Sequence, residues 1–527
     1  MKRAAFRIIA LVMVLCLMFS GCSLFGSHGT AFEDMEYTRP SPSELTSCAD
    51  RCVELAQTAT DMDTLWPEVS TFFDLYSDYF TQYLLSYVHY CQDMTDTYWT
   101  EEYNFCEEQS PQVEASRDHL LHELAKSSLR EELEGEDYFG ADYFDAYDGE
   151  SIWTDQFQAL NEQEAKLMNR YYEICQEGAA LDPYSDEYFD SYGIQLEELY
   201  IELVAVRQQL ALEAGYDSYP EYAYEQSYYR DYTPKDAMDL CNQISSELTP
   251  LYLDLAYSGF WNISIYASDD RATLQYVQTM ATNMGGEIEQ AMELMTKNNL
   301  YDISYRANKF DGSFEVYLYD YAEPFVFVSP AGSEMDHLSL AHEFGHFCND
   351  HVSDGSVVSI DTAEVFSQGM EYLSLFYSNP SDELTLTKLG DTLCVYVEQA
   401  AYSYFEQQVY GLSKEELTID NLRSIFEETC EDFGMDCWGL DSRSYVGISH
   451  FFTQPLYTIS YVVSNDAAFQ LYQLEQQQQG AGLEIYLEHL DTEQEYFLPF
   501  LEEAGLDSPF EKGRIQKVRN TLEDALL

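Results

Sequence analysis

The segment His342-Glu343-Phe344-Gly345-His346 combines the residue types of a hydrolytic metal site at a helical spacing. In a helix, positions i and i+4 lie on one face, so His342 and His346 can direct their imidazoles at one ion. Glu343 is adjacent and can polarise a water molecule there. This spacing favours zinc-assisted hydrolysis, with one Zn²⁺ per chain as cofactor and Glu343 as general base.

Such an ion needs a third protein ligand, and two candidates follow the motif. His351 lies nine residues after His342. A related zinc motif requires glycine at position 349 and histidine at position 352, and these positions hold Asn and Val. His351 therefore does not fit that pattern.

Glu364 is the better candidate for the third ligand. It begins an amphipathic stretch in which Glu364 and Glu371, seven residues apart, share one helix face. A second helix packed on the first would present Glu364 to the histidines. Two histidines and one glutamate leave a fourth position open, as in catalytic rather than structural zinc sites. The alternative is that residues 361–364 only cap the helix.

The surrounding elements are predicted to be helices, with one small sheet beside the motif. Apolar and aromatic residues recur at helical spacing from residue 43 to about 229, and Thr233-Pro234-Lys235-Asp236 marks a helix start. Residues 314–319 and 324–329 alternate as strands do. We expect a mainly α, two-lobed fold, with an N-terminal helical lobe at 43–230 and a catalytic lobe at 231–527.

The first residues indicate export. A basic start precedes an apolar run, Ile8 to Phe19, that is short for a membrane span, and Ser20-Gly21-Cys22 follows. This pattern resembles a bacterial lipoprotein signal at 1–21, with a lipid on Cys22, a tether at 22–42 and an extracytoplasmic, membrane-anchored protein. An ordinary cleaved signal or an uncleaved anchor is the alternative.

The composition restricts the partners. The net charge of -70 disfavours nucleic acid and either attracts cationic substrates or only maintains solubility. The chain has 12 Cys but no CxxC pair, so a cysteine zinc finger is not supported, and buried free thiols are expected.

The motif and its context resemble the zinc oligopeptidases of the oligoendopeptidase F and thimet oligopeptidase type. The likeness extends from about residue 200 to the C-terminus and includes these segments: Arg207 with Ala214-Gly215-Tyr216, Asn308-Lys309, Gly312-Ser313-Phe314, the His342–His346 motif, residues 363–368, Phe405-Glu406 with Tyr410, and His450-Phe451-Phe452 with Tyr457 and Tyr461.

The resemblance implies a helical fold with a deep channel between two lobes and cleavage of short peptides. His342, His346 and Glu364 would bind zinc, and Glu343 would pass the proton of the water to the leaving amine. Side chains late in the chain would hold the substrate and the oxyanion; they are His450, Tyr457 and Tyr461.

Two other functions share these features. One is a catalytically silent lipoprotein that captures peptides, although such a binder has no need of the complete set of metal ligands and base. The other is a related helical zinc carboxypeptidase, which would carry the same motif.

Overall fold

The computed structural model describes residues 29–527 apart from 136, 150, 179–180, 182–184, 357 and 493. The expected signal at 1–21 and Cys22 lie outside the described residues. Within them the chain is mainly helical with one small sheet, which confirms the predicted fold class. In that part of the chain no helix combines the length and apolar character needed to span a bilayer.

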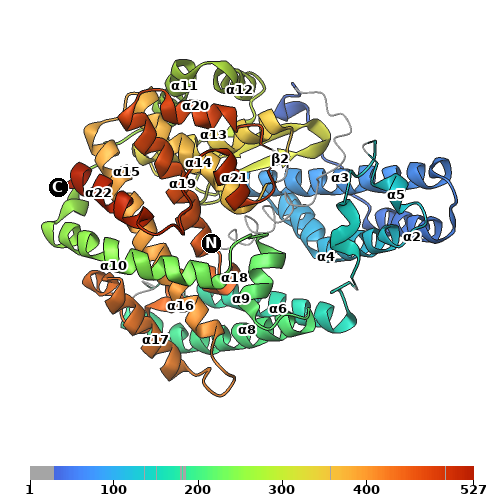
Figure 1. Cartoon of the computed structure of the whole chain (residues 1–527), viewed down its shortest axis with the longest axis horizontal. Coiled ribbons are helices and arrows are strands. Elements are labelled where there is room, and N and C mark those ends of the chain that lie inside the picture. The colour runs from blue at the N-terminus through green and yellow to red at the C-terminus, as the bar shows by residue number, and fades with distance from the viewer. Residues whose placement is uncertain are drawn as a thin grey trace.

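The N-terminal helices form a lobe that projects from the rest of the molecule (Figure 1). It consists of α2 (Pro42–Thr58), α3 (Met62–Gln92), α4 (Thr97–Ala125) and the short α5 (Arg130–Leu133). Asp61 and Asp96 cap α3 and α4 by accepting backbone N–H groups. The end of α3 reaches the sheet, where the rings of Tyr87 and Phe314 lie 4.7 Å apart.

The described part of the expected tether begins against the other lobe and then contacts the N-terminal helices, where Tyr37 and Arg39 donate to Glu102 of α4. A short 3-10 turn, η2 (Phe32–Asp34), places the Phe32 ring 4.2 Å from Phe325, and the Phe32 amide donates to the carbonyl of Asn298. The Gly29 amide donates to Glu323. The chain is therefore attached to the folded body from residue 29 onward.

The middle helices pack partly against the C-terminal half. They are α6 (Asp155–Glu177), α7 (Asp186–Tyr188), the π-helical η4 (Phe189–Gly193), α8 (Ile194–Glu213), α9 (Tyr219–Tyr222) and α10 (Pro234–Ser258). Thr233 and Asp236 form a capping box at the predicted start of α10. Arg423 forms a bidentate pair with Glu197 of α8 at 2.7 Å for both contacts. The middle helices thus contact late elements across the expected boundary at residue 230.

The sheet has three strands in the order β1-β3-β2. β1 (Tyr301–Asp302) pairs parallel with β3 (Glu323–Phe327), and β2 (Phe314–Leu318) pairs antiparallel with β3. The predicted strands 314–319 and 324–329 correspond to β2 and β3. β2 lies at the edge of the sheet, so its outer backbone groups have no strand partner among the described residues.

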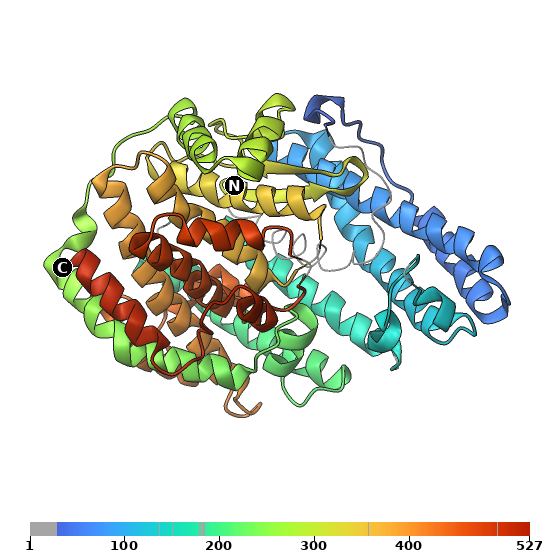
Figure 2. The ribbon, with the colours of Figure 1, turned by 45° about the horizontal axis from the view of Figure 1, so that its top comes forward.

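The remaining helices complete the C-terminal half, and α13 packs against the sheet (Figure 2). They are α11 (Asp270–Met284), α12 (Gly286–Lys297), α13 (Met335–Ser353), α14 (Ile360–Tyr377), α15 (Asp382–Cys394), α16 (Ala400–Tyr410), α17 (Ile419–Asp432), α18 (Ser449–Thr453), α19 (Thr458–Gln477), α20 (Ala481–Glu488), α21 (Phe497–Glu503) and α22 (Arg514–Leu526). Between α15 and α16 the chain forms a π-helical turn, η8 (Val395–Gln399).

Helix α14 packs on α13 and on α19, so α14 is the central element of the site. Gly345 permits the first contact, because a Cβ there would lie only 2.5 Å from the carbonyl oxygen of Phe366. The glycine within the histidine motif therefore allows the two ligand-bearing helices to approach closely. The ten cysteines of the described region are all free, as expected.

Candidate active site

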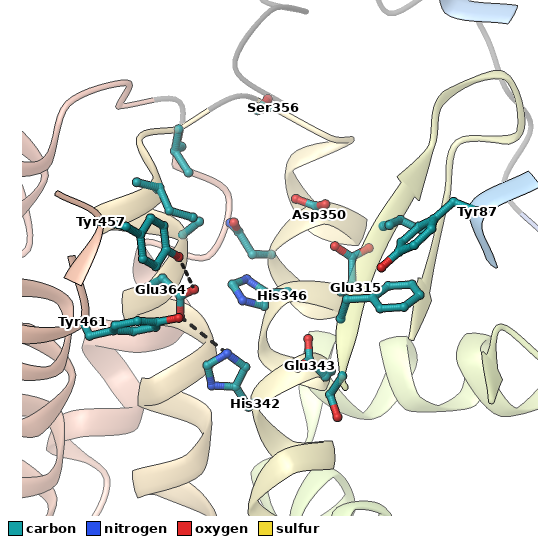
Figure 3. Close-up of a pocket in the computed structure, with 17 residues that line it drawn as sticks. Tyr87, Glu315, His342, Glu343, His346, Asp350, Ser356, Glu364, Tyr457 and Tyr461 are labelled. Atoms are coloured by element: carbon teal, nitrogen blue, oxygen red, sulfur yellow. Dashed lines mark hydrogen bonds and ion pairs between the residues drawn. The ribbon is translucent and has the colours of Figure 1, made fainter. Parts of the chain in front are cut away.

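Helices α13 and α14 bring together three candidate metal ligands. The ligand atoms of His342, His346 and Glu364 all lie within 4.8 Å of one another, and Nε2 of His342 is 3.4 Å from Oε2 of Glu364 (Figure 3). Two imidazoles on one helix face thus meet a carboxylate from the neighbouring helix. In the part of the chain that the structure describes, this is the one such group found, and His351 is not a member.

The helix-cap alternative for residues 361–364 is wrong. The cap of α14 is Ser359, whose side chain accepts from the amide of Thr362. Asp361 is buried and accepts from the Tyr232 hydroxyl at 2.9 Å. Glu364 is only 2% exposed and accepts from the Ser367 hydroxyl at 3.0 Å, which orients the carboxylate toward the histidines.

A second layer of contacts orients His342. Its Nδ1 lies 2.8 Å from Oε1 of Glu371, and Lys388 donates to the other oxygen of Glu371 at 2.7 Å. Burial alone would raise the pKa of Glu371, but Lys388 and His342 outweigh it and hold this pKa at about 2. The charged Glu371 accepts a hydrogen bond from Nδ1–H of His342, so Nε2 of His342 faces Glu364. This is the usual arrangement behind a metal-binding histidine.

Glu343 is placed as the expected base. It follows His342 on α13, lines the same cavity as the three ligands and is 6% exposed. Burial, together with the charges of Glu364 and Glu371 and against the opposing effect of His342, raises the pKa of Glu343 to about 8. A carboxyl group tuned toward neutral pH is suited to exchanging protons.

His450, Tyr457 and Tyr461 form the opposite wall. The Tyr461 hydroxyl lies 3.5 Å from Nε2 of His450, and the Tyr457 hydroxyl donates to Oε1 of Glu364 at 3.5 Å. Both tyrosines line the cavity. His450 does not line it and lies behind Tyr461. Burial lowers the pKa of His450 to about 4, so its imidazole is neutral at physiological pH.

An irregular segment joins α18 to α19 and positions this wall. Leu456 has a positive φ of 63°, a strained conformation for leucine. Its N–H donates to Glu406 at 3.0 Å, and its carbonyl accepts from Arg230 at 3.0 Å. Arg207 donates to the carbonyls of Phe451 and Phe452 at 2.8 and 2.6 Å.

The sequence patterns did not indicate the roles of Arg230 and Glu406. Arg207 and Glu406 belong to segments that carry the family resemblance, but no spacing rule connects them to residues 451–456. The physical sign of a role for Arg207, Arg230 and Glu406 is that these charged side chains are buried. Burial cannot be read from the sequence and is known only from the fold.

The cavity between these walls has a volume of about 170 Å³. It is lined by the metal group, Glu343, the two tyrosines, Ser313 and residues of β2, including Val316. No lysine or arginine is among the described residues that line it. The site can therefore hold a cation and a small part of an extended chain next to the β2 edge.

Comparisons with known proteins agree with this architecture. Residues 32–150 match the family model described as Peptidase M3 N-terminal domain. No match was found among the curated proteins. The sequence of this N-terminal region carries only helical periodicity, so the family model detects a relation that its motifs do not indicate.

Solved structures share the fold over nearly the whole chain. One described as an oligoendopeptidase F has a TM-score of 0.80 at 20% identity, covering 94% of this chain and 98% of that one. An oligoendopeptidase F from Bacillus anthracis str. Ames has a TM-score of 0.77 at 20% identity, covering 95% and 98%. PZ peptidase A with inhibitor 2 has a TM-score of 0.80 at 19% identity, covering 94% and 99%.

These TM-scores establish the fold, and the family-model match adds a likeness of residues 32–150 to M3 peptidases. The chain has the fold of oligoendopeptidase F, and the two findings agree with the resemblance drawn from its motifs. Together the findings support a peptidase.

Proposed function

We propose that this protein is a zinc-dependent endopeptidase that hydrolyses short peptides. The observation that carries the proposal is the convergence of His342, His346 and Glu364 within 4.8 Å, in a cavity that Glu343 also lines. The match to the M3 peptidase model supports it independently of the site.

The donor set suits zinc. Two neutral imidazoles and a carboxylate are the protein ligands of many catalytic zinc sites. Desolvation, with the neighbouring His342, lowers the pKa of His346 well below its usual value, so that a nitrogen lone pair is available. The contact between His342 and Glu371 supplies the orienting partner that zinc-binding histidines usually have. A bound zinc ion would polarise the scissile carbonyl and activate water.

The chain's own residues then have distinct roles. Glu343 accepts a proton from the attacking water and transfers it to the leaving nitrogen of the peptide. The Tyr461 hydroxyl donates a hydrogen bond to the oxygen on which negative charge develops, and His450, 3.5 Å behind it, orients that hydroxyl. The Tyr457 hydroxyl is directed instead toward Glu364.

The edge strand favours extended peptides as substrates. Phe314, Glu315 and Val316 of β2 line the cavity, and β2 has a free edge among the described strands. A peptide added alongside would gain backbone hydrogen bonds with little demand on its sequence. A cavity of about 170 Å³ accepts a short segment rather than a folded protein.

We also propose that the protein acts outside the cytoplasm, anchored by a lipid on Cys22. The basic and apolar start followed by Ser20-Gly21-Cys22 supports this location. Mass spectrometry of the mature N-terminus is the direct measurement. A lipid-modified Cys22 is expected, and release of the Cys22→Ala protein from membranes would agree with it; an unmodified N-terminus upstream of Cys22 would refute the anchor.

The proposed reaction is tested by combining metal content with cleavage mapping. The purified protein is expected to contain one zinc per chain and to cut peptides internally, including peptides with a blocked C-terminus. Removal of the metal with a chelator should abolish cleavage, and zinc should restore it. Cleavage only of free C-termini would indicate a carboxypeptidase, and tight binding without new termini would indicate a peptide-binding protein.

A further inference from the structure

Two carboxyl groups in the cavity have no part in the proposed reaction. Glu315 extends from β2, and Asp350 lies one helical turn after His346 on α13. Both line the cavity. Figure 3 shows their carboxyl groups close together and turned toward each other, on the other side of His346 from Tyr457 and Tyr461.

The pair has no neutralising partner in the surrounding wall. Oε1 of Glu315 is shielded from solvent and has no hydrogen-bond partner among the described residues. Desolvation raises the pKa of both groups. The charge of Asp350 and a hydrogen bond between the two carboxyl groups raise the pKa of Glu315 further, against the smaller effect of the Phe325 backbone. Two acids therefore lie side by side where the charged form of each is disfavoured.

Three other shielded carboxylates of this protein have a cation in contact. Lys309 lies 2.9 Å from Asp302, Lys388 lies 2.7 Å from Glu371, and Arg514 lies 2.8 Å from Asp466. Such pairing is the usual solution for acids removed from water. Others, such as Asp336 and Glu475, accept hydrogen bonds from several backbone N–H groups instead. Glu315 and Asp350 have no cation in contact among the described residues, and they lie in the wall of the cavity that holds the metal group.

We propose that Glu315 and Asp350 form a subsite for a positively charged lysine or arginine side chain of the peptide substrate. This inference rests on the proposed function, because it assigns a specificity to the same cavity. The incoming cation supplies the missing counter-charge, and the shielded Oε1 of Glu315 accepts a hydrogen bond from it. The acidity of the whole chain, with a net charge of -70, favours approach of such peptides.

The edge strand determines where this side chain stands in the substrate. A peptide paired with β2 directs alternate side chains to the face on which Glu315 projects. Glu315 and the metal ligands line one cavity, so the cationic residue lies close to the cleaved bond. The subsite therefore predicts lysine or arginine at one fixed position relative to that bond, rather than a general attraction to basic peptides.

The test compares matched peptides that differ only at that position. A mixed peptide pool first locates the position. Peptides with lysine, arginine, norleucine or glutamate there are then assayed, and the ratio of kcat/KM for lysine over norleucine is the readout. We expect a ratio of about 10 to 100 in the wild type, as for other shielded charge pairs, and a ratio near 1 in the Glu315→Gln/Asp350→Asn protein.

A matched control separates local from overall charge. Glu427 and Glu431 are exposed on α17 and do not line the cavity, so Glu427→Gln/Glu431→Gln removes the same formal charge elsewhere. This control should keep the wild-type ratio. The cavity variant should fold, because neutral amides remove an unpaired pair of acids, and its thermal melting temperature should equal or exceed that of the wild type.

Several results would overturn the subsite. A wild-type ratio near 1, with norleucine peptides still cleaved, would refute it and leave the peptidase intact. An equal loss of the preference for lysine in the α17 control would show that the preference depends on the overall charge of the protein and not on the two acids of the cavity. A second metal ion per chain that disappears in the cavity variant would make the two acids metal ligands instead.

The subsite can be judged even if no peptide is cleaved, which would refute the proposed function. Equilibrium binding of the lysine and norleucine peptides to the full chain is then measured. Tighter binding of the lysine peptide to the wild type, lost in the Glu315→Gln/Asp350→Asn protein, would uphold the subsite, and equal binding would refute it.

Discussion

The two walls of the cavity are built in different ways. The metal wall consists of two regular helices, α13 and α14, whose functional side chains stand at fixed helical spacings. The tyrosine wall depends on an irregular segment between α18 and α19, where Leu456 adopts a positive φ. On the first wall helix geometry positions the groups, and on the second wall buried charged residues distant in sequence position them.

This difference separates local from long-range information. Glu371 and Lys388, which orient His342, lie within 46 residues of it, whereas Arg207 is separated from Phe451 by 244 residues. A short motif can therefore predict the metal wall, and the tyrosine wall requires the complete fold. Substitutions on the two walls should also have different effects on zinc binding and turnover, because one wall holds the metal and the other contacts the reacting oxygen.

The largest expected effect comes from Glu343→Gln. The amide cannot accept the proton of the attacking water, so kcat should fall by about 10²- to 10⁴-fold, while zinc content stays at one ion per chain. His346→Gln is the comparison, because it removes a ligand and should lose zinc as well as activity. Steady-state kinetics and elemental analysis measure both; full turnover by Glu343→Gln would remove it from the reaction.

The next largest effect is expected on the tyrosine wall. Tyr461→Phe deletes the proposed oxyanion donor and should lower kcat by about 10²- to 10³-fold with little change in KM or zinc content. Tyr457→Phe is the matched control, since its hydroxyl donates to Glu364, and it should cost less than about tenfold. The reverse order of the two variants would assign the oxyanion contact to Tyr457.

Much of the fold follows from local patterns. The alternation at 314–319 and 324–329 predicted β2 and β3, and Thr233-Pro234-Lys235-Asp236 predicted the start of α10. β1 was not predicted, because a strand of two residues carries no periodic signal and forms only by pairing with β3. The packing of α8 on late helices depends on contacts such as that of Glu197 with Arg423, which no local pattern contains.

The residues of the site also differ in how far the sequence could predict them. The sequence predicted His342, Glu343, His346 and Glu364 from their spacing, and the structure brings them together. His450, Tyr457 and Tyr461 followed from resemblance, since one tyrosine pair among 45 tyrosines is not a signal in itself. Glu315 could not be distinguished from any acid on a strand until its contact with Asp350 was known.

A smaller effect should distinguish the supports of the two walls. Lys388→Met removes the cation that holds Glu371, so zinc affinity should fall by about 10- to 100-fold while turnover at saturating zinc changes less. Arg207→Met is the counterpart on the tyrosine wall and should lower kcat without changing zinc affinity. Competition with a metal chelator measures the affinity, and equal zinc loss in both variants would contradict the separation.

The smallest effect on activity is expected for Glu406→Gln. This substitution should instead change how the stability of the folded protein depends on pH. Burial raises the pKa of Glu406 to about 8 from a usual value of 4.5, so below that pH the neutral side chain accepts from Leu456, as glutamine would. Between these two values the folded state holds a proton that the unfolded state has released. The contribution of Glu406 to stability is therefore lost as pH rises through this window.

Glutamine cannot ionise, so melting temperatures of the Glu406→Gln protein should fall less steeply from pH 5 to 8 than those of the wild type, with kcat within a few-fold. Glu431→Gln, exposed on α17, should reproduce the wild-type slope. If the slopes of all three proteins coincide, Glu406 is already ionised in the fold, and Leu456 is held by a charged carboxylate. The tyrosine wall would then be fixed by charge on both sides, since Arg230 donates to the Leu456 carbonyl.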